Sequence, residues 1–197
     1  MSHPYKVHLS HDPIMKTLVE KHEIKHYWGG QPNYFLDLAE IVTGQQLSMK
    51  AADAIFKRLL DLFPDKPTPQ QILSLSIDQL RALGFSRPKG SYIHNIATAV
   101  VEGSLPVDQL DQLTDEEVAS KVTAIKGLGP WSAEMFLMFS LKRPDVFSVG
   151  DLGVRTAISR LYGIDREDRS SILNLSLQWR PFRTYACRYL WASLDNV

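Results

Sequence analysis

The chain has 197 residues, of which 44% are apolar and 22% charged, a composition that excludes a disordered or fibrous protein and fits one globular domain or two closely packed subdomains. Its single cysteine, Cys187, excludes an internal disulfide, a four-cysteine zinc site and an iron–sulfur cluster, and favours an intracellular protein. Its 22 basic and 22 acidic residues cancel, which argues against a partner held by bulk positive charge.

The charge is unevenly distributed along the chain. Residues 121–197 hold 11 basic and 7 acidic residues, whereas residues 1–120 hold 11 basic and 15 acidic ones. Any contact with a polyanion is therefore expected in the C-terminal part. No apolar run approaches the ~18 residues of a membrane span, and the N-terminus lacks the apolar stretch of a secretory signal.

Helical periodicity begins near the N-terminus and continues along most of the chain. Up to residue 124 the pattern predicts helices over 13–21 after the N-cap Asp12, over 34–43 after Asn33, over about 48–63, two short ones starting at Thr68 and Ser76, one over about 86–102, and one over 115–124 opened by the capping box of Thr114 and Glu117.

The pattern continues to the C-terminus after a tight turn at 126–130. It predicts an apolar helix over 131–141, a helix starting at or just after Asp151 and ending before Gly163, one after Asp165, and a last helix from near Pro181. No alternating strand, linker or internal repeat is visible. We therefore expect an all-α fold of about ten helices.

The segment most informative about chemistry is the turn Lys126-Gly-Leu-Gly-Pro130, which joins two of the predicted helices. Two glycines separated by one residue allow positive φ angles and let a ligand approach the backbone. The N–H groups of the turn and of the following helix start would form a donor site for an anion such as a phosphate. The alternative is a helical hairpin that merely needs glycine to turn.

These residues resemble a known family. The run Ile125–Ala133 is similar to the helix-hairpin-helix element of base-excision DNA glycosylases, and Pro144–Arg155 to the loop of that superfamily that carries its catalytic aspartate. Residues 44–48 and 181–186 extend the resemblance over roughly 30–195. The pattern is most similar to the 3-methyladenine DNA glycosylase II branch, in a short form without the N-terminal β-rich domain of larger members.

The resemblance implies a helix-hairpin-helix glycosylase fold, with two helical subdomains and an active-site cleft between them. On this basis residues 1–197 are one glycosylase unit, in which 30–120 approximate the first subdomain, 121–165 hold the hairpin and catalytic loop, and 166–197 with 1–29 approximate the second. It also implies a monomer that binds damaged double-stranded DNA and no membrane, located in the cytoplasm of a bacterium or archaeon or in a eukaryotic nucleus.

Asp151 is the candidate catalytic residue. Cleavage of an N-glycosidic bond builds positive charge on the sugar, which a fixed carboxylate stabilises while it orients or deprotonates a water. Its alternative role is a helix N-cap, paired with Arg155 one turn later, and the two roles are compatible. Many relatives have two consecutive acids here, whereas position 150 of this chain is glycine.

The resemblance also implies a monofunctional enzyme with no required cofactor. Bifunctional relatives carry a lysine nucleophile at the position of Trp131, and an indole cannot form a Schiff base. Trp131 and Trp191 match aromatic residues of the family's base pocket, and Met135 matches another lining position. Trp28 is a further candidate wall. The alternative for each tryptophan is core packing.

Further DNA contacts follow from the same resemblance. Gln46, with Leu47 beside it, matches the wedge that fills the space left by a flipped base, although polar residues also turn exposed corners. Backbone N–H groups of Gly127, Gly129 and Ser132 would meet phosphate, and Arg87 and Lys89 could add contacts. The carbonyls that would hold Na⁺ or K⁺ at the hairpin belong to Thr123, Ile125 and Leu128.

The sequence thus predicts an enzyme that flips alkylated purines of the 3-methyladenine and 7-methylguanine type out of duplex DNA and releases them by water attack at C1′. Two alternatives remain: a helix-hairpin-helix module that binds DNA without chemistry, and a lesion-binding protein of glycosylase ancestry. A pure binding module would need neither Asp151 nor the two pocket tryptophans.

Overall fold

The computed structural model describes residues 3–24 and 33–194, and every regular element within these ranges is a helix. The predicted all-α fold is therefore confirmed. The chain forms two compact units: unit 1 combines residues 1–29 with 142–197, and unit 2 consists of residues 30–141. Within the described ranges, none of the helices has the length and apolar character needed to cross a lipid bilayer.

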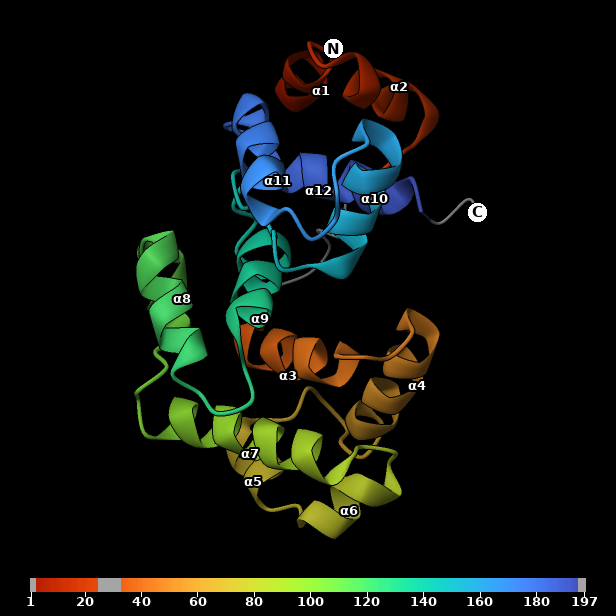
Figure 1. Cartoon of the computed structure of the whole chain (residues 1–197). Helices are drawn as coiled ribbons and strands as arrows, with labels where there is room; N and C mark the ends of the chain where they lie inside the picture. The colour runs from red at the N-terminus through yellow and green to blue at the C-terminus, as the bar shows by residue number, and fades with distance from the viewer. Residues whose placement is uncertain (1–2, 25–32, 195–197) are drawn as a thin grey trace. The chain divides into compact units, whose positions relative to one another are not determined.

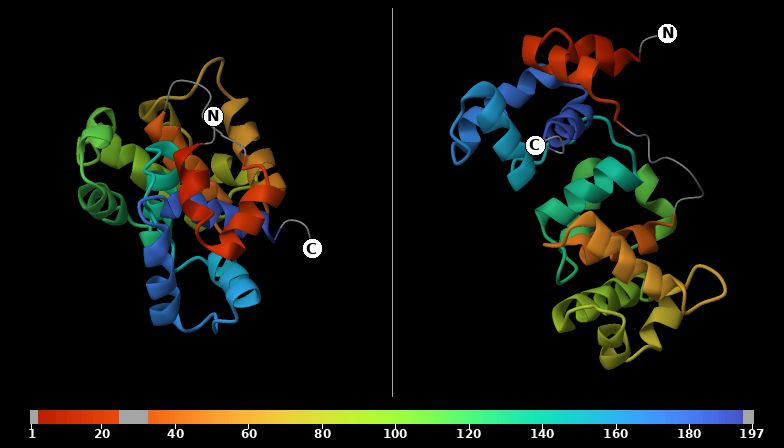
Figure 2. Two further views of the ribbon diagram at one scale, coloured as in Figure 1. Left: turned by 90° about the horizontal axis from the view of Figure 1, so that it is seen from above. Right: turned by 90° about the vertical axis from the view of Figure 1, so that its right-hand side faces the viewer.

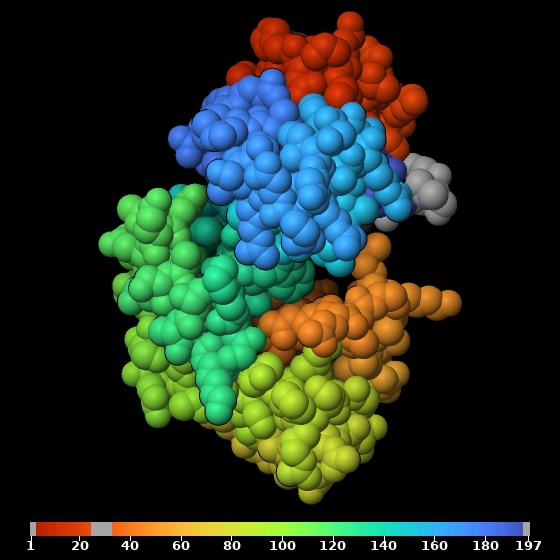
Figure 3. All heavy atoms as spheres, viewed as in Figure 1, coloured from red at the N-terminus to blue at the C-terminus, as the bar shows by residue number. Residues whose placement is uncertain are grey.

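The described residues of unit 1 form six helical segments. They are α1 (Pro4–Leu9), α2 (Pro13–Lys21), α10 (Leu152–Tyr162), α11 (Arg169–Ser176), the 3₁₀ turn η3 (Leu177–Trp179) and α12 (Arg183–Ala192). Helices α2 and α10 both pack against α12, and α1 lies beside α2 (Figures 1 and 2). In Figure 3 the residues of α10 and α11, in shades of blue, form much of the visible surface of this unit.

A buried aspartate ties the elements of unit 1 together. Asp12 caps α2, where its Oδ1 accepts hydrogen bonds from the backbone N–H groups of Ile14 (2.9 Å) and Met15 (3.2 Å). Its Oδ2 accepts from the Tyr162 hydroxyl (2.7 Å) and the Trp179 indole (3.0 Å). Burial, together with the bond to the Asp12 carboxylate, raises the pKa of the Tyr162 hydroxyl. The four donors explain how a carboxylate is accommodated here.

Unit 2 is built around α3, shown in orange-brown in Figure 1. Its helical segments are α3 (Tyr34–Gly44), α4 (Met49–Leu60), α5 (Pro69–Leu73), α6 (Ile77–Ala82), α7 (Arg87–Val101), the 3₁₀ segment η1 (Val107–Gln112), α8 (Asp115–Thr123), α9 (Pro130–Met135) and the π-helical turn η2 (Phe136–Ser140). Helix α3 packs against α4, α7, α9 and η2, while α5 and α6 pack on α7.

The core of unit 2 follows the apolar stripe predicted for residues 34–43. Phe35, Leu38, Ala39 and Val42 are all buried, as a face at helical spacing requires. Ile93 and Ile96 of α7 and Phe136 of η2 are fully buried as well. These residues hold α3 against the segment that follows the hairpin, so the hairpin has a rigid support.

Eight of the predicted helix starts agree with the structure, and each of these rests on a local side chain. At these positions the side chain accepts a hydrogen bond from a backbone N–H of the first turn: Asp12, Asn33, Ser48, Thr68, Ser76, Ser86, Thr114 and Asp151. The Thr114 capping box forms with both of its reciprocal bonds.

The structure differs from the prediction at five segments. The sequence pattern does not predict α1, η1 or η3, and the helix expected after Asp165 begins only at Arg169, capped by Asp168. The apolar helix expected over 131–141 is α-helical to Met135 and then becomes π-helical, since the Leu141 N–H bonds the Phe136 carbonyl five residues back (3.0 Å). Tertiary packing, rather than local propensity, decides such details.

Candidate functional site

Asp151 lies at the start of α10, directly after the loop 144–150. Its backbone is extended (φ −71°, ψ 126°), and its Oδ1 accepts a hydrogen bond from the Val154 N–H at 2.8 Å. The predicted N-cap is therefore confirmed. The carboxylate lies at the positive end of the helix dipole. The side chain is half-buried, so it is partly accessible to solvent without being fully hydrated.

Trp191 meets this carboxylate from α12. Its indole Nε1–H donates to Asp151 Oδ1 at 2.8 Å, and the tryptophan is itself half-buried. The structure thus brings together two of the predicted site residues that are 40 positions apart in the sequence. The sequence motifs predict a stacking surface at Trp191, and the structure adds its hydrogen bond to Asp151, which no local pattern indicates.

The loop that leads to Asp151 is fastened to the first turn of α12. Arg183 donates to both carboxylate oxygens of Asp145, from Nε at 2.7 Å and from Nη2 at 2.9 Å. Thr184 Oγ1 donates to the Arg143 carbonyl (2.6 Å) and accepts from the Val146 N–H (3.0 Å). Helix α12 therefore holds the loop with its first turn and the Asp151 carboxylate with its last.

Arg155 does not need Asp151 as its partner. Its Nη1 donates to Glu167 Oε2 and to the Arg166 carbonyl, both at 2.9 Å. The guanidinium therefore joins α10 to the loop before α11, while the Asp151 carboxylate receives the Val154 and Trp191 donors. A half-buried, oriented carboxylate of this kind can stabilise a positive charge that develops next to it.

The hairpin of unit 2 joins α8 to α9 through residues 124–129. Gly127 has a φ of +107°, and a Cβ built there would overlap the ring of Tyr92 from α7. Gly129 is the N-cap of α9 with a φ of −105°, and a Cβ there would meet nothing within 4 Å. The positive φ and the contact with Tyr92 thus explain why residue 127 is glycine, whereas the space next to the Gly129 Cα is empty of protein atoms.

The predicted wedge lies in the short connection between α3 and α4. Gln46 is exposed and has a φ of +58°, and Leu47 is 41% exposed. The neighbouring Gln45 anchors this loop to the hairpin, because its Nε2 donates to the Gly127 carbonyl and to Ser132 Oγ, both at 3.1 Å. The sequence alone does not predict this anchoring role for Gln45.

Lys89 supports the same loop. Its ammonium group donates to the carbonyls of Thr43 (2.9 Å) and Gln45 (2.6 Å), which closes the C-terminal end of α3. Burial lowers the pKa of Lys89. Lys89 thus has a structural role in this loop, whereas Arg87 is exposed and lies 3.6 Å from Asp78.

Trp131 and Met135 belong to α9 and lie four residues apart, which places them on one face of the helix. Trp131 is half-buried and Met135 is 6% exposed. Both residues are part of unit 2, whereas Asp151 and Trp191 are part of unit 1. Phe182 lies at the opposite end of α12 from Trp191, where its ring contacts His8 and Tyr185. Trp28 falls outside the described residues.

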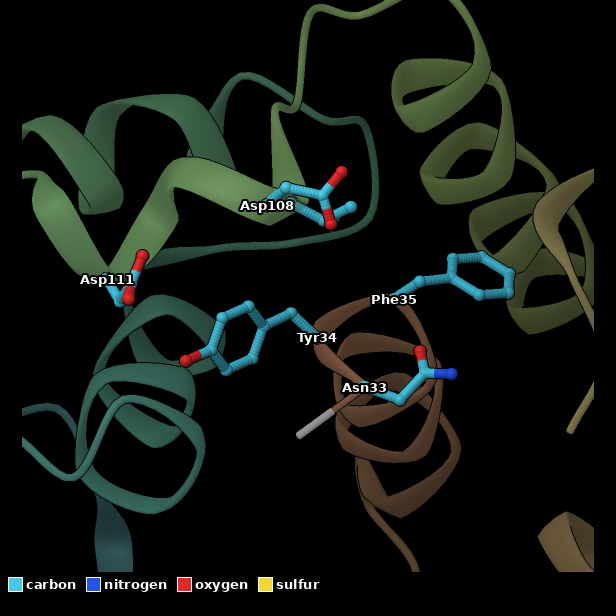
Figure 4. Close-up of a pocket in the computed structure, with 6 residues that line it drawn as sticks. Asn33, Tyr34, Phe35, Asp108 and Asp111 are labelled. Atoms are coloured by element: carbon cyan, nitrogen blue, oxygen red, sulfur yellow. The ribbon is translucent and has the colours of Figure 1, made fainter. Parts of the chain in front are cut away.

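A pocket of about 410 Å³ in unit 2 contains none of the predicted site residues. As Figure 4 shows, Asp108 and Asp111 of η1 face the start of α3 with Tyr34. Two exposed carboxylates make this pocket unsuitable for a phosphate. Among the described residues, no group of three or more His, Cys, Asp or Glu side chains is placed to bind a metal ion.

Comparison with known proteins identifies the family. The family model described as HhH-GPD superfamily base excision DNA repair protein matches residues 39–181. This chain belongs to that superfamily. The matched range contains the wedge loop, the hairpin and Asp151, so the resemblance carried by the sequence motifs is confirmed.

Individual superfamily members are similar over most of the chain. DNA-3-methyladenine glycosylase 1 of Schizosaccharomyces pombe is 37% identical over 79% of this chain and 70% of its own length. A putative DNA-3-methyladenine glycosylase of Bacillus subtilis is 31% identical over 80% of this chain, but the match spans only 58% of that protein.

A solved structure gives the same result for the fold. The S. pombe 3-methyladenine DNA glycosylase Mag1, in complex with abasic DNA, has a TM-score of 0.89 and 33% identity, and the match covers 98% of this chain and 97% of that one. The superfamily fold predicted from the motifs is thereby confirmed.

Proposed function

We propose that this chain is a monofunctional DNA glycosylase of base-excision repair that releases alkylated purines of the 3-methyladenine and 7-methylguanine type from duplex DNA. Membership of the superfamily and the names of the similar proteins support this proposal. The observation that carries it is the Asp151 carboxylate, half-buried and held by Val154 and Trp191. The comparisons do not favour a non-catalytic DNA-binding module.

The reaction places a specific demand on Asp151. As the bond between C1′ and the base nitrogen breaks, its electron pair leaves with the base, which an alkyl group has already made cationic and hence a good leaving group. The deoxyribose becomes positively charged, and the negative carboxylate stabilises it. Water then attacks C1′ and loses a proton to Asp151 or the solvent, which leaves an abasic site and a free purine.

Trp131 supports the monofunctional assignment. It occupies the position at which bifunctional members, according to the resemblance, carry a lysine. The indole has no amine that could replace water as the nucleophile or form a Schiff base. We therefore assign the nucleophile to water, and expect no strand cleavage to accompany base release.

The remaining site residues are assigned by the same proposal, in which one monomer binds damaged duplex DNA in the cytoplasm of a bacterium or archaeon or in a eukaryotic nucleus. A flipped purine needs apolar and aromatic walls, and an N-alkylated purine is attracted to an indole face. The walls are assigned to Trp131, Trp191 and Met135. The exposed Gln46 and Leu47 form the wedge, supported from behind by Gln45.

The hairpin is assigned to the DNA backbone. A helix start with a glycine turn offers N–H groups to phosphate without any net positive charge on the protein. These groups belong to Gly127, Gly129 and Ser132. A structural Na⁺ or K⁺ is assigned to the carbonyls of Thr123, Ile125 and Leu128, and we propose that catalysis itself requires no cofactor.

The decisive experiment compares wild type with Asp151→Asn on duplex DNA treated with a methylating agent, and quantifies released 3-methyladenine and 7-methylguanine. Asparagine is as good an N-cap as aspartate, so this variant keeps the start of α10 and loses mainly the charge. Asp168→Asn is the matched control, because Asp168 also caps a helix of unit 1, through the Ser171 N–H at 3.0 Å.

Wild type and Asp168→Asn are expected to release both bases, and Asp151→Asn to be slower by about 100-fold or more with DNA affinity unchanged. Full activity of Asp151→Asn would contradict the mechanism. Absence of base release by wild type from DNA carrying several alkyl lesions would contradict the enzyme class.

A further inference from the structure

Two hydrogen-bond donors converge on one oxygen of Asp151. The Val154 backbone N–H and the Trp191 indole N–H both point to Oδ1, each at 2.8 Å. The first comes from the helix that the aspartate caps, and the second comes from α12. Hydrogen bonds from N–H groups to a carboxylate at this length are strong and directional. Together they fix both the position of the carboxylate and the rotation of its plane.

Gly153 provides the space for this arrangement. It lies in the first turn of α10 and does not have the left-handed conformation that would require glycine. A Cβ built on it would lie 3.0 Å from Asp151 Oδ1, 3.0 Å from Trp191 Cδ1 and 3.1 Å from Trp191 Nε1. Both residues of the hydrogen bond would therefore have to move to admit even an alanine.

Glycine within a helix is unfavourable compared with alanine, because it loses more conformational freedom on folding. No backbone requirement of α10 compensates for this cost at position 153. Glycine at this position is explained by the close approach of Trp191 to Asp151. Any residue with a Cβ at position 153 would displace one of these two side chains.

We propose that Trp191 and Gly153 are positioning residues for the proposed reaction: the indole N–H holds the Asp151 carboxylate in the orientation that faces C1′, and the missing side chain at position 153 lets it do so. This inference rests on the proposed glycosylase function. It gives Trp191 a role as a hydrogen-bond donor in addition to the stacking surface that any aromatic ring would supply.

The two roles of Trp191 are separable by substitution. Trp191→Phe keeps an aromatic ring and removes the N–H, but the smaller ring also stacks less with the base, so a slower rate in this variant is assigned to the hydrogen bond only when Gly153→Ala is slower as well. Gly153→Ala leaves the indole intact and adds one methyl group where the hydrogen bond passes. Since alanine is favoured over glycine in a helix, Gly153→Ala is expected to fold even if Trp191→Phe does not.

The experiment measures single-turnover release of 7-methylguanine from a defined duplex, with the affinity for a duplex that contains a stable abasic analogue measured in parallel. Each single variant is expected to lower the rate constant by about 10- to 100-fold, as loss of a hydrogen bond to a charged group implies, with affinity within about threefold of wild type. A merely structural defect would lower the fraction of active enzyme, which is titrated separately with limiting enzyme, and not the rate constant measured with enzyme in excess.

The double variant Trp191→Phe/Gly153→Ala completes the test. If both residues act through one hydrogen bond, it is expected to be no slower than the slower single variant. Additive losses, or a wild-type rate for Trp191→Phe or for Gly153→Ala, would overturn the inference. The proposed function would survive that outcome as long as wild type releases the base and Asp151→Asn does not.

Discussion

Gly127 allows a quantitative test of the hairpin. Its φ of +107° lies in a region that residues with a Cβ rarely adopt, at a cost of about 1 to 3 kcal/mol. A Cβ there would also overlap Cγ and Cδ1 of Tyr92 and lie 2.6 Å from Cδ2. These atoms are at the base of the ring, so the whole side chain would have to rotate away. Such overpacking costs about 1 to 3 kcal/mol more.

Gly127→Ala is therefore expected to lower the free energy of unfolding by about 2 to 6 kcal/mol. In a chain of this size about 1 kcal/mol corresponds to ~2–4 °C, so the midpoint of thermal unfolding should fall by at least ~4 °C. Circular dichroism at a helix wavelength measures both quantities, in a temperature ramp and in a urea titration.

Gly129→Ala is the matched control, two residues away in the same turn. A Cβ on Gly129 would meet nothing within 4 Å, and alanine is only a poorer N-cap than glycine, so Gly129→Ala should lower the free energy of unfolding by no more than about 1 kcal/mol. In a Tyr92→Ala background the cost of Gly127→Ala should shrink to its conformational part of about 1 to 3 kcal/mol. A wild-type midpoint for Gly127→Ala, or an equal loss in Gly129→Ala, would refute this reasoning.

Three further predictions concern polar contacts. Asp12→Asn removes a buried carboxylate with four donors, and is expected to cost about 2 to 4 kcal/mol in urea unfolding; a cost below ~1 kcal/mol would contradict the network. Lys89→Met leaves the carbonyls at the end of α3 without their ammonium donor, and should lower the free energy of unfolding in urea by about 1 to 3 kcal/mol. It should also loosen the loop that contains Gln45, which is measured as faster amide hydrogen exchange. Hydrogen bonds from Thr114 lower the pKa of Glu117, so the ionised carboxylate stabilises the fold above its unfolded pKa, and this stabilisation is lost as the pH falls through the lowered value. In Thr114→Ala the pKa of Glu117, followed by NMR, should rise toward its ordinary value. An unchanged pKa would refute the assignment.

The parts of the fold that could be predicted from the sequence are those decided within one or two helical turns. Ser76 and Gln79, for example, are three residues apart and form a complete capping box at the start of α6. Gly84, with a φ of +107°, follows the end of that helix, where a left-handed residue is usually glycine. Helix α1 could not be predicted in this way, because it has only six residues and its buried Tyr5 and Leu9 gain their stability from distant packing.

The candidate site divides in the same way. The capping role of Asp151 could be read from its own neighbourhood, whereas the Trp191 bond joins residues 40 positions apart and the Gln45 bonds span more than 80. Lys89 shows why charge alone misleads: a lysine near a helix start is typical of a phosphate contact, but here its ammonium is turned toward two carbonyls. Pairings of this kind depend on tertiary structure, and no periodicity encodes them.

Three aspartates of unit 1 cap helices in the same local manner, and their surroundings alone distinguish them. Asp12 has two side-chain donors besides the backbone but is only 8% exposed, so no substrate could reach it. Asp168 is exposed, so water hydrates its charge. Backbone and side-chain bonds with Ser171 lower its pKa. Asp151 combines partial exposure with a donor from a distant helix, which makes its charge both accessible and directed. A carboxylate that stabilises a cation on a substrate needs both properties, because a buried one cannot reach the substrate and a fully hydrated one interacts with it only weakly.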